Sequence, residues 1–207
     1  KRIKNSKITV KCRLGVDNQN PETVLPEFLN TLIDAGVDGI IIHARKAILN
    51  GLSPKENRNI PILNYELVKQ MKVKFPQTEI VINGGIDSLG RARQFIRDGL
   101  DGAMIGRAAY HNPQEILLHA DTEIFEKNHP CKSMKNVLLD LCDYIERELS
   151  KGSRLNEITR HILGAFNGEP GARAFRQVIS EQAHIPKAGT EVVRAALDKV
   201  SHNSKTN

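Results

Sequence analysis

Residues 35–40 read AGVDGI, and residues 98–103 read DGLDGA. Each segment follows an amphipathic stretch of helical length and leads into a short apolar run, so each is expected to be a helix-to-strand turn. Gly36 and Gly99 can take the left-handed conformation that commonly ends a helix. One turn repeated at two places predicts successive units of a single β/α array.

Four short apolar runs supply the strands of that array. Three of them are close to continuously apolar, which is typical of strands buried on both faces of a parallel sheet. The expected strands are Ile8–Cys12, Gly39–Ile42, Glu79–Ile82 and Asp101–Ile105. Helices are expected at Glu22–Ala35, Asn64–Phe75, Ser88–Asp98 and Pro113–Ala120. Strand alternating with helix predicts a parallel sheet with helices outside.

Four β/α units are half of an eight-unit barrel. We therefore expect an α/β fold in which residues 1–125 form the C-terminal half of a (β/α)8 TIM barrel. A half-barrel leaves two sheet edges and one sheet face uncovered, so the other strands are expected upstream of Lys1. The first residues, KRIKNSK, look like a cut inside a longer protein. A free-standing four-stranded open sheet is the alternative.

The pattern changes after about residue 125. Apolar side chains recur at three- and four-residue spacings over Ser133–Ser150, which predicts an amphipathic helix. Further helical stretches follow at Leu155–Phe166, Pro170–Ala183 and Thr190–Val200, without a strand pattern. We expect a small all-helical domain over residues 126–207.

The composition is that of a soluble, folded protein. Of the 207 residues, 40% are hydrophobic and 26% are charged, and no apolar run approaches the ~20 residues that a membrane helix needs. The net charge of +6 weakly favours an anionic partner such as nucleic acid or phosphate, although a basic protein without such a partner fits equally well. Cys12, Cys131 and Cys142 are too few and scattered for a disulfide framework or a metal site, and they fit a reducing cytosol.

Glycines follow the last two expected strands, at the carboxyl ends where parallel β/α proteins bind ligands. The segments are Asn83-Gly84-Gly85 and Gly106-Arg107. Paired glycines before a helix can bring backbone N–H groups to an anion such as a phosphate. Tight turns are the other explanation for these glycines.

Cationic side chains stand at other informative positions. Lys11 lies in mid-strand, where a buried ammonium faces a ligand or a carboxylate unless it reaches solvent. His43 is the first polar residue after a buried strand. Arg173 and Arg176 are one helical turn apart and could bind a phosphate backbone, with a merely solvated surface as the alternative.

Several segments, in this order, resemble the tRNA-dihydrouridine synthases, specifically their A subfamily. They are ITVKCRLG (residues 8–15), HARKAILNGLSPKENRNIP (43–61), INGGI (82–86) and GRAAYHNP (106–113). The later segment RHILGAFNGEPGARAFRQVISE (160–181) resembles the helical domain of that subfamily. The long HARKA to SPKENR segment is highly specific, and the resemblance covers nearly the whole chain.

The resemblance implies an FMN-dependent barrel followed by a helical tRNA-binding domain. Such an enzyme uses NADPH to reduce a D-loop uridine of tRNA to 5,6-dihydrouridine, and it is expected to be cytoplasmic and monomeric. Matching positions assign the flavin to Lys11 and His43, and its ribityl phosphate end to Asn83, Gly84, Gly85, Gly106 and Arg107. They assign tRNA contacts to Lys55, Arg58, Arg173 and Arg176.

The catalytic cysteine of the family lies in the upstream half of the barrel. The resemblance therefore implies no catalytic residue within this chain, and little or no synthase activity for the chain alone. Two other interpretations stay open. One is a non-catalytic RNA-binding remnant of such an enzyme, and the other is a different FMN- or phosphate-binding barrel oxidoreductase that acts on a small molecule.

Overall fold

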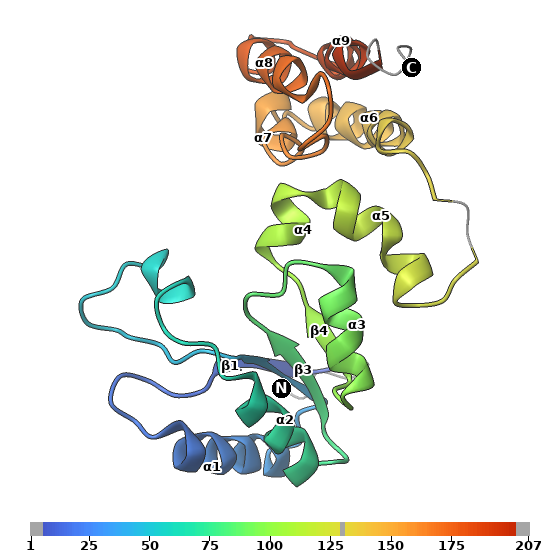
Figure 1. The fold of residues 1–207 in the computed structure, drawn as a ribbon. Helices are drawn as coiled ribbons and strands as arrows, with labels where there is room; N and C mark the ends of the chain where they lie inside the picture. Colours follow the sequence, from blue (N-terminus) through green and yellow to red (C-terminus); the bar gives the residue numbers. More distant parts are fainter. Residues whose placement is uncertain (1–5, 129–130, 202–207) are drawn as a thin grey trace. The chain divides into compact units, whose positions relative to one another are not determined.

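The computed structural model describes residues 6–128 and 131–201 (Figure 1). Its contacts divide the chain into two compact units, Lys1–Gly106 and Arg107–Asn207. The first unit contains the sheet and the second is helical, and each is described by itself.

The sheet of the first unit has four strands in the order in which they follow one another along the chain. They are β1 (Thr9–Arg13), β2 (Gly39–His43), β3 (Glu79–Asn83) and β4 (Gly102–Met104). All three strand pairings are parallel, which confirms the expected α/β sheet. The first three strands end one residue later than expected, because their polar last residues continue the pairing.

Three helices alternate with these strands: α1 (Pro21–Asp34), α2 (Tyr65–Lys74) and α3 (Leu89–Arg97). The side chains of Ile40, Ile42, Ile80 and Ile82 are fully buried, whereas Ile41 and Val81 between them are only partly buried. Successive residues of a strand point to opposite faces of the sheet. The three helices therefore cover the face that holds the four isoleucines (Figure 1).

The opposite face of the sheet has no described helix of this unit over it. A shallow hollow of about 410 Å³ lies there, and Thr9, Ile41, Val81 and Met104 are among the residues that line it. Lys11 pairs with Ile41 in the parallel register and so belongs to the same face. The sheet thus has one buried face and one open face.

The two matching turns have the same structure. The carboxylate of Asp101 accepts from the amide of Ile80 at 2.7 Å, and the amide of Asp101 donates back to the carbonyl of Ile80 at 3.1 Å. Asp38 makes the same two bonds with Ile8, at 2.6 and 2.8 Å. Each aspartate therefore ties a new strand to the beginning of its neighbour. The expected positive φ angles are +81° at Gly36 and +99° at Gly99.

Helices are the regular secondary structure of the second unit among its described residues. Its helices are α4 (Arg107–His111), α5 (Pro113–Glu123), α6 (Met134–Ser150), α7 (Leu155–Thr159), α8 (Ala172–Gln182) and α9 (Thr190–Ser201). Buried side chains of α6, α8 and α9 form its core, in which the rings of Phe166 and Phe175 meet edge to face at 5.0 Å. Among the described residues, no helix combines the length and apolar character that crossing a bilayer requires.

One helix prediction for this unit is corrected, and one helix was not predicted. The helix expected over Leu155–Phe166 ends at Thr159, because the chain then tightens into three-residue turns. The amide of Ile162 donates to the carbonyl of Thr159, and that of Ala165 donates to Ile162, both at 3.0 Å. Helix α4 was not expected from the sequence.

The contacts also divide the chain after Gly106 rather than near residue 125. Helices α4 and α5 therefore group with the later helices and not with the sheet. The functional domains expected at residues 1–125 and 126–207 remain a prediction.

Candidate functional site

The carboxyl ends of the four strands form one row across the sheet. Arg13 pairs with His43, His43 with Asn83, and Asn83 with Met104. Paired residues of parallel strands share a face, so these side chains are neighbours. The amide Nδ2 of Asn83 donates to the carbonyl of Met104 at 2.7 Å, which ties the ends of β3 and β4 together. His43 is 8% exposed and, with Thr159, is a buried polar residue in the part of the chain that the structure describes.

Lys11 lies in the next row of the same face, two residues before Arg13. Lys11 is exposed, which agrees with the alternative that its side chain reaches solvent. Its amine is nevertheless partly desolvated. Burial and then the charge of Arg13 lower the pKa of Lys11. The open face therefore carries a lysine whose positive charge lacks an anionic neighbour in its row. Cys12 points to the opposite face, and burial raises its pKa to about 11.

The glycine pair after β3 is required by close packing. Gly84 and Gly85 have φ angles of +111° and +64°. A Cβ on Gly84 would lie 2.5 Å from Cδ2 of His43, and a Cβ on Gly85 would lie 2.8 Å from Cδ1 of Leu63. The hydroxyl of Tyr65 donates to the carbonyl of Gly84 at 2.8 Å. The tight-turn explanation thus accounts for both glycines without a ligand.

The helix that follows this pair begins where the sequence predicts. Helix α3 begins at Leu89, and the hydroxyl of Ser88 accepts from the amide of Arg91 at its first turn. The helix expected at Ser88–Asp98 is thereby confirmed three residues after Gly85, and the phosphate site at the two glycines stays a prediction.

Gly106 and Arg107 stand at the division between the two units. A Cβ on Gly106 would meet nothing within 4 Å, and Arg107 is exposed at the beginning of the five-residue helix α4. The structure thus brings Lys11, His43, Asn83, Gly84 and Gly85 to one end of the sheet. It does not place Arg107 relative to them.

Arg13 fastens the segment between β2 and α2 to the sheet. Its Nη1 donates to the carbonyls of Lys46 and Asn57, both at 2.8 Å. The side chain of Asn57 closes the segment on itself, because its Nδ2 donates to the carbonyls of Ile48 and Leu52 and its Oδ1 accepts from the amide of Ile48. These bonds give a long surface segment a defined conformation.

Lys55 and Arg58 project from this fastened segment. Both are exposed: Lys55 precedes the short helix η1 (Glu56–Arg58), and Arg58 is its last residue. The carboxylate of Glu56 accepts from the amide and hydroxyl of Ser53, at 2.8 and 2.7 Å, and these bonds lower the pKa of Glu56. The two expected tRNA contacts therefore stand on one ordered surface.

Arginines gather where this segment meets the strand ends. Burial, followed by the charges of Arg45 and Arg58, lowers the pKa of Arg13. Arg45 donates through Nη1 to the carbonyl of Pro61, and its buried Nε has no hydrogen-bond partner among the described residues. Sequence reasoning did not select Arg13 or Asn57. The position of Arg13 at a strand end was a usable signal, whereas the bonds of Asn57 leave no sequence pattern.

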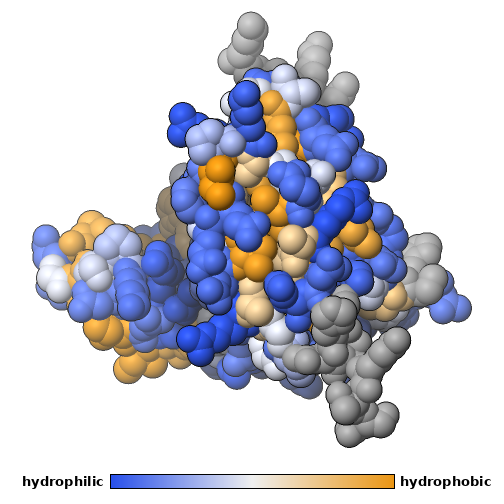
Figure 2. Space-filling model, turned by 90° about the horizontal axis from the view of Figure 1, so that it is seen from above, coloured by the Kyte–Doolittle hydropathy of each residue, from blue (hydrophilic) through white to orange (hydrophobic). Residues whose placement is uncertain are grey.

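Arg173 and Arg176 lie on α8 in the second unit, one turn apart. Arg173 is exposed and Arg176 is half-buried, while Phe175 between them is fully buried in the core. The arginines therefore occupy the outer side of α8. The face shown in Figure 2 is largely hydrophilic, and polar side chains interrupt its hydrophobic patches.

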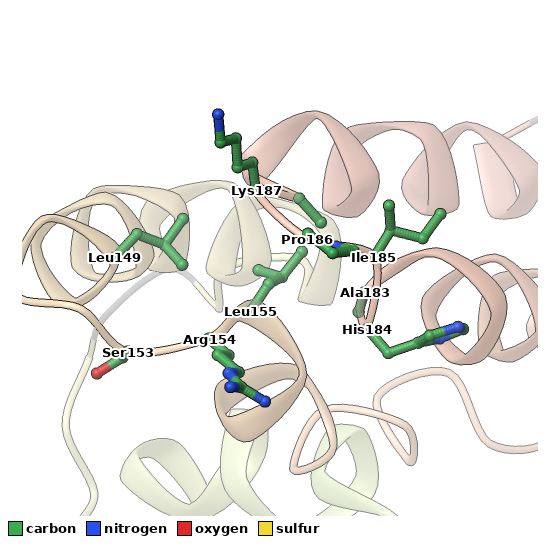
Figure 3. A pocket seen from close by; sticks show the side chains of 10 residues that line it. Leu149, Ser153, Arg154, Leu155, Ala183, His184, Ile185, Pro186 and Lys187 are labelled. Carbon is green, nitrogen blue, oxygen red and sulfur yellow. The ribbon is translucent and has the colours of Figure 1, made fainter.

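A pocket of about 460 Å³ opens between the end of α6 and the turn that joins α8 to α9 (Figure 3). Leu149, Leu155 and Pro186 contribute apolar walls. The charged ends of Arg154 and Lys187 point in different directions. These two cations therefore do not converge on one point of the pocket.

A protein-family model described as dihydrouridine synthase (Dus) matches residues 1–201. This chain belongs to the dihydrouridine synthase family. The resemblance carried by the strand-end segments is thereby confirmed at the level of the family.

Relatives of this dihydrouridine synthase chain carry a more specific name. A protein of Vibrio cholerae serotype O1 named tRNA-dihydrouridine(20/20a) synthase is 47% identical over 196 residues, which are 94% of this chain and 59% of that protein. A Yersinia pestis protein of the same name is 49% identical over 195 residues, which are 94% of this chain and 56% of that protein. The chain thus spans somewhat more than half the length of these relatives.

Among solved structures, a mandelate oxidase mutant with benzaldehyde is similar to this chain at a TM-score of 0.33. It is 13% identical, and the similarity covers 92% of this chain and 55% of that protein. A similarity at this level carries no argument about fold or function.

Proposed function

We propose that this dihydrouridine synthase chain is part of an enzyme that reduces a D-loop uridine of tRNA to 5,6-dihydrouridine. FMN is the proposed flavin and NADPH the proposed reductant. The observation that carries the proposal is the 47% identity to a Vibrio cholerae protein whose name states a tRNA-dihydrouridine(20/20a) synthase.

We also propose that the four-stranded sheet is half of a (β/α)8 barrel. The support is the sequential order of four parallel strands, together with helices on one sheet face only. On this proposal the open face, with Lys11, Ile41 and Val81, looks into the barrel. The row of Arg13, His43 and Asn83 then lies at the barrel mouth, where barrel enzymes bind their substrates.

The residues of these rows fit a phosphorylated flavin. The side chains of Lys11, Arg13 and His43 are cationic or neutral donors, and the two rows contain no acidic side chain. The exposed Gly106 leaves open space at the end of β4. A flavin phosphate carries roughly two negative charges, which suits this set of donors.

Each expected residue then has a role. Lys11 and His43 would contact the flavin. Asn83, Gly84, Gly85 and Gly106 would hold the ribityl phosphate end, with Arg107, the next residue in the chain, as a further partner. When bound, FMN supplies the hydride that reduces the uracil ring. Burial and Arg13 lower the pKa of Lys11, and an anion beside its ammonium would raise that pKa again and stabilise the positive charge.

None of the cysteines of this chain is proposed as the proton donor to the uracil ring. Cys12 points away from Lys11 and His43, into the face that the helices cover. Cys142 is fully buried in the helical core, and the thiol of Cys131 donates to the carbonyl of Leu118 in the second unit. We therefore propose that this chain has little synthase activity by itself.

The proposed contacts with tRNA are Lys55 and Arg58 on the fastened segment and Arg173 and Arg176 on α8. All four are cationic; three of them are exposed, and Arg176 is half-buried. Cations of this kind bind RNA phosphates without reading sequence.

The test uses a full-length synthase that contains this chain. It should purify with flavin absorbance and form dihydrouridine in unmodified tRNA when NADPH is supplied. The control substrate is the same tRNA with its D-loop uridines replaced by cytidine. Binding of tRNA without reduction would favour the RNA-binding remnant. Flavin-dependent NADPH oxidation without any change in tRNA would favour an oxidoreductase for small molecules.

A further inference from the structure

Helix α4 is part of the helical unit although it follows directly after the last strand. It spans Arg107–His111 and begins with the arginine proposed for the flavin phosphate. The contacts of the chain group it with α5 to α9. The residues that hold α4 in this unit therefore set the position of Arg107.

Gly164, in the turns after α7, makes the closest approach to α4. A Cβ on Gly164 would lie 2.7 Å from the carbonyl oxygen of His111 and 3.0 Å from that of Tyr110. Both are backbone atoms, which cannot rotate out of the way as a flexible side chain can. Gly164 has no positive φ, so the need for glycine comes from this contact alone. Any side chain at this position must push α4 away.

Tyr110 joins α4 to the same turn through a side-chain hydrogen bond. Its hydroxyl lies 3.1 Å from Nδ1 of His161, and the two rings meet edge to face. The Nε of Arg160 donates to Nε2 of His161 at 3.1 Å. Because the arginine can only donate, Nε2 must accept, so a neutral His161 carries its proton on Nδ1 and donates it to Tyr110. The ring thus has a defined tautomer and orientation.

A third contact continues the connection into α5. The amide Nε2 of Gln114 donates to Oε1 of Glu169 at 3.0 Å. Residues 110–114 are thereby joined to residues 160–169 by one close backbone contact and two side-chain hydrogen bonds. Their separation of 51 and 55 positions along the chain makes these contacts tertiary rather than local.

We propose that Tyr110, His161 and Gly164 are positioning residues for Arg107. They hold α4, and with it the arginine at its beginning, in one position within the helical unit. This inference depends on the proposed function, because it assumes that Arg107 binds the phosphate of FMN. It makes flavin retention sensitive to residues that do not touch the flavin.

The first measurement needs no flavin. Hydrogen exchange of the backbone amides in residues 107–112 is compared between the 207-residue chain and its Gly164→Ala and Tyr110→Phe variants. Loss of one hydrogen bond should speed exchange about two- to tenfold in Tyr110→Phe, and more in Gly164→Ala. The matched controls are Gly90→Ala, where a Cβ meets nothing within 4 Å, and Tyr144→Phe on α6. Neither control should change exchange in α4.

The second measurement is the rate of FMN loss from a full-length synthase on dilution. Arg107→Ala, Gly164→Ala and Tyr110→Phe should each release FMN faster, while Gly90→Ala and Tyr144→Phe should match the unsubstituted protein. If Gly164→Ala fails to fold, Tyr110→Phe and His161→Phe provide the same test.

The outcomes separate the inference from the proposed function. If Arg107→Ala retains FMN normally, the phosphate assignment itself is wrong. If Arg107→Ala loses FMN but Tyr110→Phe and Gly164→Ala retain it, the positioning role is wrong. Unchanged exchange of α4 in both variants would also overturn it.

Discussion

His43 occupies the space that a side chain at Gly84 would need. A Cβ on Gly84 would lie 2.5 Å from Cδ2 and 2.9 Å from Nε2 of the histidine ring. His43 is the last residue of β2, and Gly84 follows the last residue of the neighbouring strand β3. The histidine ring is buried against the turn that contains Gly84. The conformation of the Asn83-Gly84-Gly85 segment is thus fixed by packing, in addition to its proposed role at the flavin phosphate.

Substitution of this glycine should therefore destabilise the fold. Gly84→Ala combines a φ of +111° with an overlap onto His43, and it should lower the free energy of unfolding by about 1–3 kcal/mol. Urea unfolding measures the change. Gly90→Ala, in a helix with open space around it, should be neutral or stabilising by about 0.5–1 kcal/mol.

A double substitution tests the cause. His43→Ala removes the ring from the space, so the costs of Gly84→Ala and His43→Ala should not add. Fully additive costs would show that the ring does not exclude the side chain.

The order of the segment that carries Lys55 and Arg58 should depend on Asn57. Asn57→Ala removes the side-chain bonds to Ile48 and Leu52, so hydrogen exchange over residues 46–58 should rise and tRNA affinity should fall. Lys55→Ala is the matched control, since it should lower tRNA affinity without speeding exchange. Unchanged exchange in Asn57→Ala would contradict the role of Asn57.

The sheet could be predicted because the sequence patterns that indicate its strands and turns are local. The apolar runs marked the strands, and the two Gly-containing turns had the expected conformation. The ends of β1, β2 and β3 were placed one residue early, because polar residues such as His43 and Asn83 continue the pairing after the apolar run stops. The expected fourth strand, Asp101–Ile105, is shorter in the structure, where β4 spans Gly102–Met104. Polar residues at a strand end can therefore be part of the paired strand and also be candidate site residues.

The connections that organise the site were less predictable. Arg13 donates to the carbonyl of Asn57, which lies 44 positions later in the chain. Gly164 lies so close to the backbone of α4 that a side chain would not fit there, and no periodic pattern in the sequence indicates this contact. The shortened α7 has the same origin, since the residues after Thr159 form tight turns instead of continuing the helix. Sequence patterns report local periodicity, whereas these features arise from tertiary packing.

The arginines of α8 should contribute to tRNA binding through charge. Arg173→Ala combined with Arg176→Ala should weaken tRNA binding and reduce the slope of log affinity against log salt by about 1–2. Flavin content should be unchanged. The control is Arg147→Ala with Lys151→Ala on α6 and its cap, which removes the same charge. Equal losses in both pairs would indicate an unspecific effect of net charge.

The thiol of Cys12 should make stability depend on pH in the alkaline range. Burial raises the pKa of Cys12 from its ordinary value of 9.0 to about 11, so the folded state keeps the proton more tightly than the unfolded chain. Its contribution is fully present below pH 9.0 and is lost as the pH rises toward about 11. Unfolding measured across this range should show a steeper fall for the unsubstituted chain than for Cys12→Ala. The same steep fall in Cys12→Ala would exclude this thiol as the cause, and Cys131→Ala should retain it.

We propose that the carboxyl ends of β1 to β4 hold a phosphorylated flavin. The most direct measurement is the FMN content of a purified full-length synthase carrying Lys11→Ala or Arg107→Ala, after gel filtration. Lys7→Ala is the control, because Lys7 is exposed, precedes β1 and pairs with Glu79 at the opposite end of the sheet. We expect FMN to be lost from the first two variants and kept by the third, with each lost charged contact weakening affinity about tenfold or more. Equal FMN content in all three variants and in the unsubstituted enzyme would contradict the claim.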